Sequence, residues 1–461
     1  MTYLSSLRFF RLASTTVALG FASTALATNP SVWPTWRGPS GAGIAPAATP
    51  PIEWSETKNV KWKANVPGLG FSTPIVWHDR IFLLTAVETS DTAPGAEPAT
   101  PPPNTAPDKK GGKRGKGPGG FGGGPKPTKF HEFAVVALDR KTGKTIWQKT
   151  ARREVPHEGR HQTNSYASGS PVTDGEHLYV PFGSRGFYCY DLNGNLKWEK
   201  DLGDMQTRGS FGEGASPALA GDRLIIHWDH EAGSFIVALD KKTGRELWRK
   251  SREERSSWST PLIVEVGGKT QAIIAATNRT RSYDVATGDV IWEAGGLTDN
   301  VIPTPVTGHG MVYLTSGFRG NAVQAVKLTA RGDVTENSDY IVWSMRKSTP
   351  YVPSPVLSGD RLYFTKSNDA YLTCVNALTG EVHYQDQLLP NVRGIYASPV
   401  AANGHVYIAG REGTTLVIKD APKFEIVATN KLDDRIDASP VMLDKELFLR
   451  GHEHLYCIAE K

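Results

Sequence analysis

Three residues in separate loops have side chains that suit the binding of a cofactor. Trp258 offers a flat stacking surface, and Glu213 and Asn300 offer the oxygen ligands that a hard cation such as Ca²⁺ prefers. Each stands shortly before a Ser/Thr-Pro dipeptide, and other candidates hold the same kind of position, namely Asn164, Tyr166, Asp299, Arg393, Tyr396, Asp434 and Asp437. The alternative interpretation is that these side chains satisfy loop backbone groups around a water-filled channel. We assign no catalytic residue.

Two stretches rich in histidine have a composition that suits a metal site but a spacing that does not. In "HWDHEAG", His227 belongs to a predicted strand, where neighbouring side chains point to opposite faces, so His227 and His230 are poorly placed to converge. In "GHEHLY", His452 and His454 share one side of an extended segment, but no third ligand is evident. The cysteines stand alone in apolar segments, which predicts buried free thiols at Cys189, Cys374 and Cys457. We therefore predict no metal site.

The elements that must position these loops are repeats. The stretch "VALDRKTGKTIWQK" (136–149) returns as "VALDKKTGRELWRK" (237–250), and self-similarity of this kind marks a structural unit used several times. A Ser/Thr-Pro dipeptide followed by apolar residues recurs eight times, and from Pro171 onward its prolines are 41 to 50 residues apart. Each unit reads as four short strands, with Thr-Gly at the last turn and Asp as a cap for the turn amides.

Units of this length with four strands predict an all-β, eight-bladed β-propeller of four-stranded antiparallel blades. The last unit lacks its fourth strand, and "NVKWKANV" (59–66) supplies the missing segment, so we expect an N-terminal strand to close the last blade. One large aromatic side chain in the fourth strand is expected to fill the space between neighbouring blades. These residues are Trp62, Trp147, Trp198, Trp248, Trp292, Trp343 and Tyr384.

The pattern Asp-x-x-Thr-Gly-x-x-x-Trp, as in 240–248, resembles the PQQ-like (pyrroloquinoline quinone) repeat family, and "WPTWRGPSGAG" (33–43) is similar to the start of exported members. The family includes quinoprotein alcohol dehydrogenases and BamB. The resemblance implies PQQ with calcium as the cofactor of an enzyme, and a protein partner for a BamB-like chain. The adjacent cysteine pair of the dehydrogenases is missing. The first cysteine is Cys189, so anchoring through a lipidated N-terminal cysteine is not expected.

Targeting and linker segments account for the charge of the chain. Residues 1–27 read as a cleaved signal peptide, ending near Ala27, which predicts a periplasmic or secreted protein with no membrane span. Residues 28–58 form a lead-in, and 59–461 form the propeller. The Pro/Gly/Lys-rich stretch 88–129 predicts a disordered insertion in the first blade. Without these basic segments the formal charge of +5 disappears, which argues against binding to nucleic acid.

Two functions remain open at this point. We favour a monomeric, non-enzymatic propeller that binds a protein or peptide partner on its loop face and is BamB-like in architecture, because the repeated residues are explained by packing. The alternative is a PQQ-dependent oxidoreductase that acts on an alcohol or a sugar, with Trp258, Glu213 and Asn300 near the cofactor. The sequence favours a protein that is not an enzyme, and PQQ with calcium belongs to the alternative only.

Overall fold

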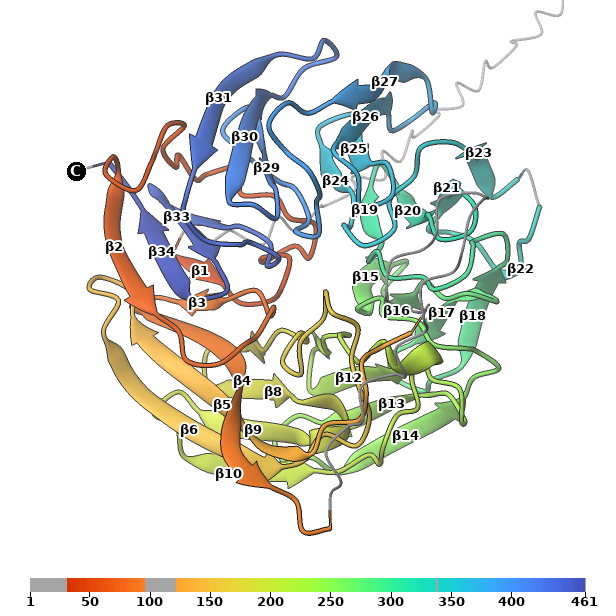
Figure 1. The fold of residues 1–461 in the computed structure, drawn as a ribbon. Helices are drawn as coiled ribbons and strands as arrows, with labels where there is room; N and C mark the ends of the chain where they lie inside the picture. The colour runs from red at the N-terminus through yellow and green to blue at the C-terminus, as the bar shows by residue number, and fades with distance from the viewer. Residues whose placement is uncertain (1–30, 96–121, 337–338, 461) are drawn as a thin grey trace, which may run out of the picture.

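A ring of eight sheets makes up the computed structural model of this chain, which describes residues 31–95, 122–336 and 339–460 (Figure 1). The predicted signal peptide and residues 96–121 of the predicted insertion lie outside the described residues. Apart from two short 3₁₀ helices, η1 (Gly183–Arg185) and η2 (Arg208–Ser210), the regular elements of the described residues are all strands. The predicted eight-bladed, all-β propeller is therefore confirmed.

The blades follow one another along the chain, and the strands of each are given from the inner to the outer edge. Blade 1 holds β1 (Val32–Trp33), β3 (Ile75–Trp77), β4 (Arg80–Thr92), β5 (Lys129–Asp139) and β6 (Thr145–Glu154). Blade 2 holds β7 (Val172–Thr173), β8 (His177–Pro181), β9 (Phe187–Asp191) and β10 (Leu196–Lys200). Blade 3 holds β11 (Ala218–Ala220), β12 (Arg223–Trp228), β13 (Phe235–Asp240) and β14 (Glu246–Ser251). Blade 4 holds β15 (Leu262–Val266), β16 (Lys269–Ile274), β17 (Thr280–Asp284), β18 (Val290–Ala294) and the short parallel strand β22 (Gly332–Asp333).

The second half of the ring has the same order. Blade 5 holds β19 (Val306–Gly308), β20 (Met311–Ser316), β21 (Ala322–Lys327) and β23 (Ile341–Met345). Blade 6 holds β24 (Val356–Ser358), β25 (Arg361–Thr365), β26 (Tyr371–Asn376) and β27 (Val382–Leu388). Blade 7 holds β28 (Val400–Ala402), β29 (His405–Ala409), β30 (Thr414–Lys419) and β31 (Ile426–Lys431). Blade 8 holds β32 (Val441–Leu443), β33 (Glu446–Arg450), β34 (His454–Ile458) and, as its outer strand, β2 (Val60–Asn65).

The N-terminal strand closes the ring as predicted. β2 pairs antiparallel with β34, and Trp62 lies opposite Cys457. Alternate residues of β2 are partly buried and exposed, which is the pattern of an outer strand with one face on the core. Figure 1 shows β2, near the start of the chain, beside β34, near its end. Hydrogen bonds within blade 8 thus join the two ends of the chain, and the segment after β2 continues directly into blade 1.

The Thr-Gly turn of one blade packs against the tryptophan of the preceding blade. In blade 3 the Asp240 carboxylate accepts hydrogen bonds from the Thr243 amide (2.9 Å) and hydroxyl (2.8 Å). Gly244 has a φ of +69°, and a Cβ atom on it would lie 2.7 Å from the Trp198 ring of blade 2. The Trp198 indole donates to the Lys241 carbonyl at 3.0 Å. Glycine is therefore required both by the backbone conformation and by the ring that covers it.

Five indoles make this contact, each donating to the residue after the turn's Asp or Asn, and they are Trp62, Trp147, Trp198, Trp248 and Trp343. Trp292 and Tyr384 differ. Trp292 is fully buried in blade 4, and its indole nitrogen has no acceptor among the described residues. Tyr384 packs edge-on against Phe424 of blade 7, with ring centres 5.7 Å apart.

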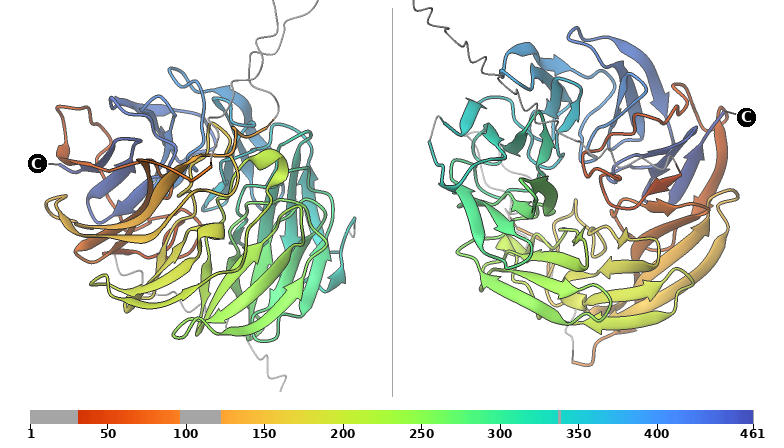
Figure 2. Two further views of the ribbon diagram at one scale, coloured as in Figure 1. Left: turned by 60° about the horizontal axis from the view of Figure 1, so that its bottom comes forward. Right: turned by 180° about the vertical axis from the view of Figure 1, so that it is seen from behind.

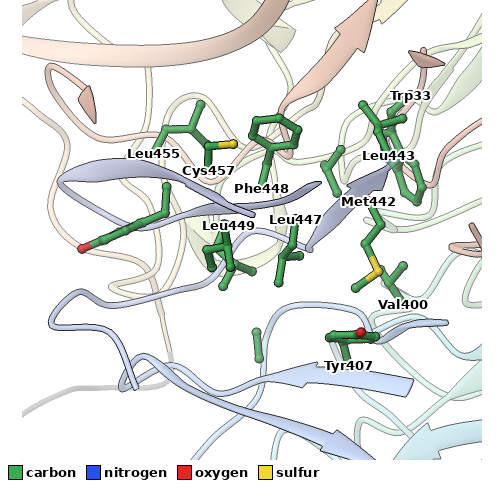
Figure 3. Packing of buried hydrophobic residues seen from close by; sticks show 14 of the residues in the cluster. Trp33, Val400, Tyr407, Met442, Leu443, Leu447, Phe448, Leu449, Leu455 and Cys457 are labelled. Carbon is green, nitrogen blue, oxygen red and sulfur yellow. The ribbon is translucent and has the colours of Figure 1, made fainter. Parts of the chain in front are cut away.

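Blade 7 lacks an aromatic residue in its outer strand, and the lead-in supplies one. In blade 2, for example, Tyr179 and Trp198 have ring centres 6.1 Å apart. The equivalent outer position of blade 7 is Ala428, which lies opposite Val417. Trp54 instead stacks on Tyr407, with ring centres 6.4 Å apart, and it is 3% exposed. Figure 3 shows Tyr407 in the apolar packing between blades 7 and 8.

The lead-in also crosses the inner side of the ring. β1 pairs with β3 and is therefore the innermost strand of blade 1. Farther along, the Ala45 amide donates to the Ala401 carbonyl of blade 7 at 2.8 Å, and the Thr49 amide donates to the Asp444 carbonyl of blade 8. The red start of the chain runs among the blades drawn in blue (Figures 1 and 2). These hydrogen bonds hold the lead-in against blades 7 and 8, which positions Trp36 and Arg37 near the centre of the ring.

Candidate functional site

A cavity of about 410 Å³ lies at the centre of the face made by the loops between blades and the loops between second and third strands. Its size is within the range of small-molecule sites. Among the predicted loop candidates, those that line it are Asn164, Glu213, Trp258, Tyr396 and Asp437. Tyr166 lines two smaller cavities instead. Asp299, Asn300, Arg393 and Asp434 are not among the lining residues of the central cavity.

Aromatic side chains form a large part of the cavity wall, and they are Trp36, Phe71, Phe211, Trp258, Phe318, Tyr351 and Tyr396. They are held in place by neighbours. The Trp258 indole donates to the Gly212 carbonyl at 2.7 Å. Phe318 stacks on Tyr351 with ring centres 4.9 Å apart. Such a wall suits a flat or apolar ligand group, because aromatic faces provide large contact areas at a small entropic cost.

A closed ring of hydrogen bonds surrounds the inner end of the cavity. The residue before each repeated proline donates its amide to the side-chain hydroxyl of the same residue in the next blade, with distances of 2.9 to 3.2 Å. We call this ring the hydroxyl collar, and it consists of Thr73, Ser170, Ser216, Thr260, Thr304, Ser354, Ser398 and Ser439. Proline lacks an amide hydrogen and favours an extended residue before it, which explains why the dipeptide recurs.

A charged cluster stands at one side of the cavity. Asp437 accepts two hydrogen bonds from Arg411, at 2.6 and 3.0 Å, and contacts the His452 imidazole at 2.9 Å. Burial would raise the pKa of Asp437, but the hydrogen bonds from His452 and Arg411 outweigh burial and hold this pKa below its usual range. Arg411 also lies over the Tyr396 ring, 4.3 Å from its centre. The Asp437 charge is therefore balanced within the protein.

Glu213 stands at another side of the cavity and is held by Ser184. The Ser184 amide donates to its carboxylate at 2.8 Å, and the Ser184 hydroxyl donates to the second oxygen. Burial raises the pKa of Glu213, and these hydrogen bonds oppose the rise only in part. A carboxylate that is occupied in this way presents less of its coordinating capacity to the cavity.

The three residues proposed for a cofactor do not meet at one point. Trp258 and Glu213 line the same cavity, whereas Asn300 is 2% exposed and its amide oxygen accepts a hydrogen bond from Arg208 at 3.1 Å. The aromatic wall suits a flat ring such as that of PQQ. The oxygen donors Glu213 and Asn300 do not form a common calcium cage in this arrangement. Among the described residues, no group of three or more His, Cys, Asp or Glu side chains is arranged to hold a metal ion.

The histidine stretches have other partners. Asp229 makes a buried double hydrogen bond with Arg252, at 2.7 and 3.0 Å, and His227 contacts Ser257. His452 contacts Asp437, whereas His454 contacts Asp434 at 3.2 Å. His230 contacts the Gly233 carbonyl at 3.1 Å, so each pair of histidines is divided between different partners. Cys189, Cys374 and Cys457 are buried and free.

The described ends of the predicted insertion approach the same face. β4 and β5 pair as far as Thr92 opposite Lys129. Gly122 lines the central cavity, the Gly123 amide donates to the Gly209 carbonyl at 2.6 Å, and the Gly124 amide donates to the Arg160 carbonyl at 2.8 Å. This end of the insertion therefore rests on the loop between blades 1 and 2 and on the loop between blades 2 and 3.

Most of the aromatic residues that line the cavity were not predicted from the sequence. Phe71, Phe211 and Tyr351 stand shortly before a Ser/Thr-Pro dipeptide, as Trp258 does, but they were not proposed because polar side chains were favoured. Phe318 lies between the second and third strands of blade 5, a kind of loop from which no aromatic candidate was drawn. Arg411 follows the second strand of blade 7, so its position could not be inferred from the Ser/Thr-Pro dipeptides. Trp36 carried no such signal, because its place depends on how the lead-in crosses the ring.

Comparisons with known proteins agree on the family and the fold. The family model described as "Outer membrane protein assembly factor BamB" matches residues 131–386 and 232–461. A protein of that name from Francisella salina is 30% identical over 128 residues, which is 26% of this chain and 23% of the relative. A tetrathionate hydrolase from Acidithiobacillus ferrooxidans is 21% identical over 303 residues, which is 59% of this chain and 53% of the relative. The chain therefore matches about a quarter and about half of these two relatives.

Two solved structures share the fold at low sequence identity. The crystal structure of BamB from Moraxella catarrhalis matches with a TM-score of 0.50 and 14% identity, over 71% of this chain and 88% of that one. The quinohemoprotein alcohol dehydrogenase ADHIIG from Pseudomonas putida HK5 matches with a TM-score of 0.54 and 9% identity, over 93% and 80%. No helix among the described residues is long and apolar enough to cross a membrane. The shared fold does not distinguish a binding protein from a dehydrogenase.

Proposed function

This chain belongs to the family of outer membrane protein assembly factor BamB, and from that premise we propose that it is an exported, monomeric, non-enzymatic propeller that binds a protein or peptide partner on its loop face. The observation that carries the proposal is the aromatic wall of the central cavity, of which Phe211, Trp258 and Tyr396 are part. Aromatic side chains dominate the energetics of protein recognition.

The charges at the cavity support the same proposal. Asp437 is balanced by Arg411 and His452, and Glu213 is hydrogen-bonded by Ser184, so these acids have internal partners. A binding site of this kind offers apolar contact and few unpaired charges, which is typical of the centre of a protein interface. The name of the family, which refers to assembly of the outer membrane, is consistent with a partner protein outside the cytoplasm.

Selection of peptides on the purified mature protein tests this proposal. Peptides enriched from a random display library are measured against the wild type and against Trp258→Ala and Tyr396→Ala. We expect Trp258→Ala and Tyr396→Ala each to bind the peptides at least about tenfold more weakly than the wild type, because truncation of a central aromatic residue removes a dominant contact. Lys144→Ala, in the turn on the opposite face, is the control and should leave binding unchanged. Equal affinity for all four proteins would argue against the loop face.

The second candidate function is a PQQ-dependent oxidoreductase that acts on an alcohol or a sugar. The stacking surface of Trp258 beside Glu213 favours it, as does the fold shared with a quinohemoprotein alcohol dehydrogenase. Titration of PQQ with and without calcium, followed by tryptophan fluorescence and by dye-linked oxidation of alcohols and sugars, tests this candidate. Calcium-dependent binding with turnover, both reduced in Glu213→Gln, would establish it in place of the binding protein.

A further inference from the structure

The hydroxyl collar presents hydrogen-bond donors to the central cavity. Each collar oxygen already accepts an amide hydrogen from the preceding blade. None of the collar hydroxyls donates to an acceptor within the part of the chain that the structure describes, as the hydrogen bonds of Ser170, Ser216 and Thr260 illustrate. Six collar residues line the cavity, namely Thr73, Ser170, Ser216, Thr260, Ser398 and Ser439. Buried donors without acceptors are costly, so this end of the cavity favours a ligand that accepts hydrogen bonds.

Two buried arginines contact the backbone next to collar residues. Arg37 is 2% exposed and donates to the carbonyls of Pro399 at 3.1 Å and Pro355 at 2.7 Å, the residues that follow Ser398 and Ser354. Arg450 is equally buried and donates to the Ser72 carbonyl at 2.8 Å, beside Thr73. Both guanidinium groups therefore contact carbonyls one residue away from collar positions, Arg37 at the starts of blades 6 and 7 and Arg450 at the start of blade 1.

Neither arginine forms an ion pair with a carboxylate of the described residues, in contrast to Arg252, which is paired with Asp229. Burial lowers the pKa of Arg37 and of Arg450 to about 9, so both remain cationic at neutral pH. Each buried positive charge is held by carbonyl and hydroxyl oxygens alone and has no counter-ion within the described ranges, so it favours a negative charge placed nearby, where water is excluded. Two carboxylates of the described chain line the same cavity: Asp437 is balanced by Arg411, and Glu213 accepts hydrogen bonds from Ser184.

We propose that the collar end of the cavity binds an anionic oxygen group, either a carboxylate or an inorganic oxoanion, and that the aromatic wall holds any flat apolar body attached to it. The anion would accept hydrogen bonds from collar hydroxyls and would offset the charges of Arg37 and Arg450. Phe211 and Trp258, which line the same cavity, would contact the body of the ligand. This inference goes beyond partner binding and does not depend on it, because a small molecule satisfies it.

Calorimetric titration of the mature protein at low ionic strength tests the site with three probes. Benzoate carries both features, sulfate carries only the charge, and benzyl alcohol is the neutral match of benzoate. We expect benzoate, sulfate or both to bind at least about tenfold more tightly than benzyl alcohol, and this binding to weaken as salt is added. Binding of sulfate points to a free oxoanion as the natural ligand, and binding of benzoate alone points to an aromatic acid. Equal or undetectable binding of all three probes would overturn the proposal.

Substitutions locate the site. Arg37→Met should weaken anion binding about tenfold, whereas Arg249→Met, on the outer strand β14, should leave it unchanged. Because loss of Arg37 also removes contacts of the lead-in, the pair Ser216→Ala and Thr260→Val provides a second test that retains both arginines. These variants should each weaken binding of the anion without changing the affinity for benzyl alcohol. Anion affinity that is the same in all of these variants as in the wild type would place the anion elsewhere.

Discussion

The contact between the Thr-Gly turn and the tryptophan of the preceding blade predicts that two glycines of the same blade differ in how much stability they lose on replacement by alanine. Gly244 and Gly221 are both in turns of blade 3, with φ values of +69° and +62°. A Cβ atom at position 244 would lie 2.7 Å from the Trp198 ring, whereas a Cβ atom at 221 would have no heavy atom within 4 Å. Replacement by alanine therefore imposes the same backbone strain at both positions and a steric conflict only at 244.

The expected magnitudes follow from this difference. A left-handed alanine costs about 1–2 kcal/mol, and this cost applies to both variants. Displacement of the Trp198 ring adds about 1–3 kcal/mol of overpacking for Gly244→Ala, including weakening of its hydrogen bond to the Lys241 carbonyl. Gly244→Ala should thus lose about 2–5 kcal/mol of the free energy of unfolding, and Gly221→Ala only about 1–2 kcal/mol.

Urea denaturation followed by circular dichroism measures these free energies, and tryptophan fluorescence of the folded proteins reports the Trp198 environment. We expect the emission of Gly244→Ala to change in the native state and that of Gly221→Ala to match the wild type. If both variants lose the same free energy and show wild-type emission, the glycine does not serve the contact between blades, and the account of the repeat is wrong.

Three further predictions concern other interactions. Trp54→Ala should lower the free energy of unfolding in urea by about 3–5 kcal/mol, because it leaves a cavity beside Tyr407 where blade 7 has only Ala428. Trp54→Phe should lower it clearly less, and equal losses would show that the stacking is unimportant. Asp229→Asn should lose about 3–5 kcal/mol, because it leaves Arg252 buried without its counter-charge, and a loss below about 1 kcal/mol would contradict this buried pair. The pKa of Asp437 is lowered in the folded state, so its stabilising contribution is complete above the unfolded pKa of about 3.9 and is lost as the pH falls through the lower folded value. Acid titration of stability should therefore be less steep in Asp437→Asn than in the wild type, and identical profiles would refute the assignment.

The blades were predictable because their determinants are local and repeated. The Asp cap, the left-handed glycine and the tryptophan of 240–248 lie within one short segment, and the same signals recur around the ring. The closing strand was predictable as well, since the last unit lacked a fourth strand and residues 59–66 matched it. Predictions from such local patterns are confirmed because each repeat unit is stabilised mainly by its immediate neighbours.

Contacts between distant segments could not be predicted in this way. Trp54 replaces an absent blade residue from a position before the propeller repeats, and nothing in the period of the repeat indicates this role. Arg37 reaches carbonyls more than three hundred residues away, as the separations of its hydrogen bonds show. The candidate site shares this limitation. Trp258 and Glu213 were placed in one cavity by the loop argument, but the position of Asn300 behind Arg208 depends on three-dimensional packing.

The proposed binding of a partner on the loop face is tested most directly by photo-cross-linking in the cells that produce the protein. A photoreactive phenylalanine analogue replaces Tyr396 at the cavity in one variant and Lys144 on the opposite face in another. The account predicts a discrete protein adduct from position 396 that is absent at position 144 and lost when Trp258→Ala is added. Adducts at position 144 alone, or equal adducts at both positions, would contradict it.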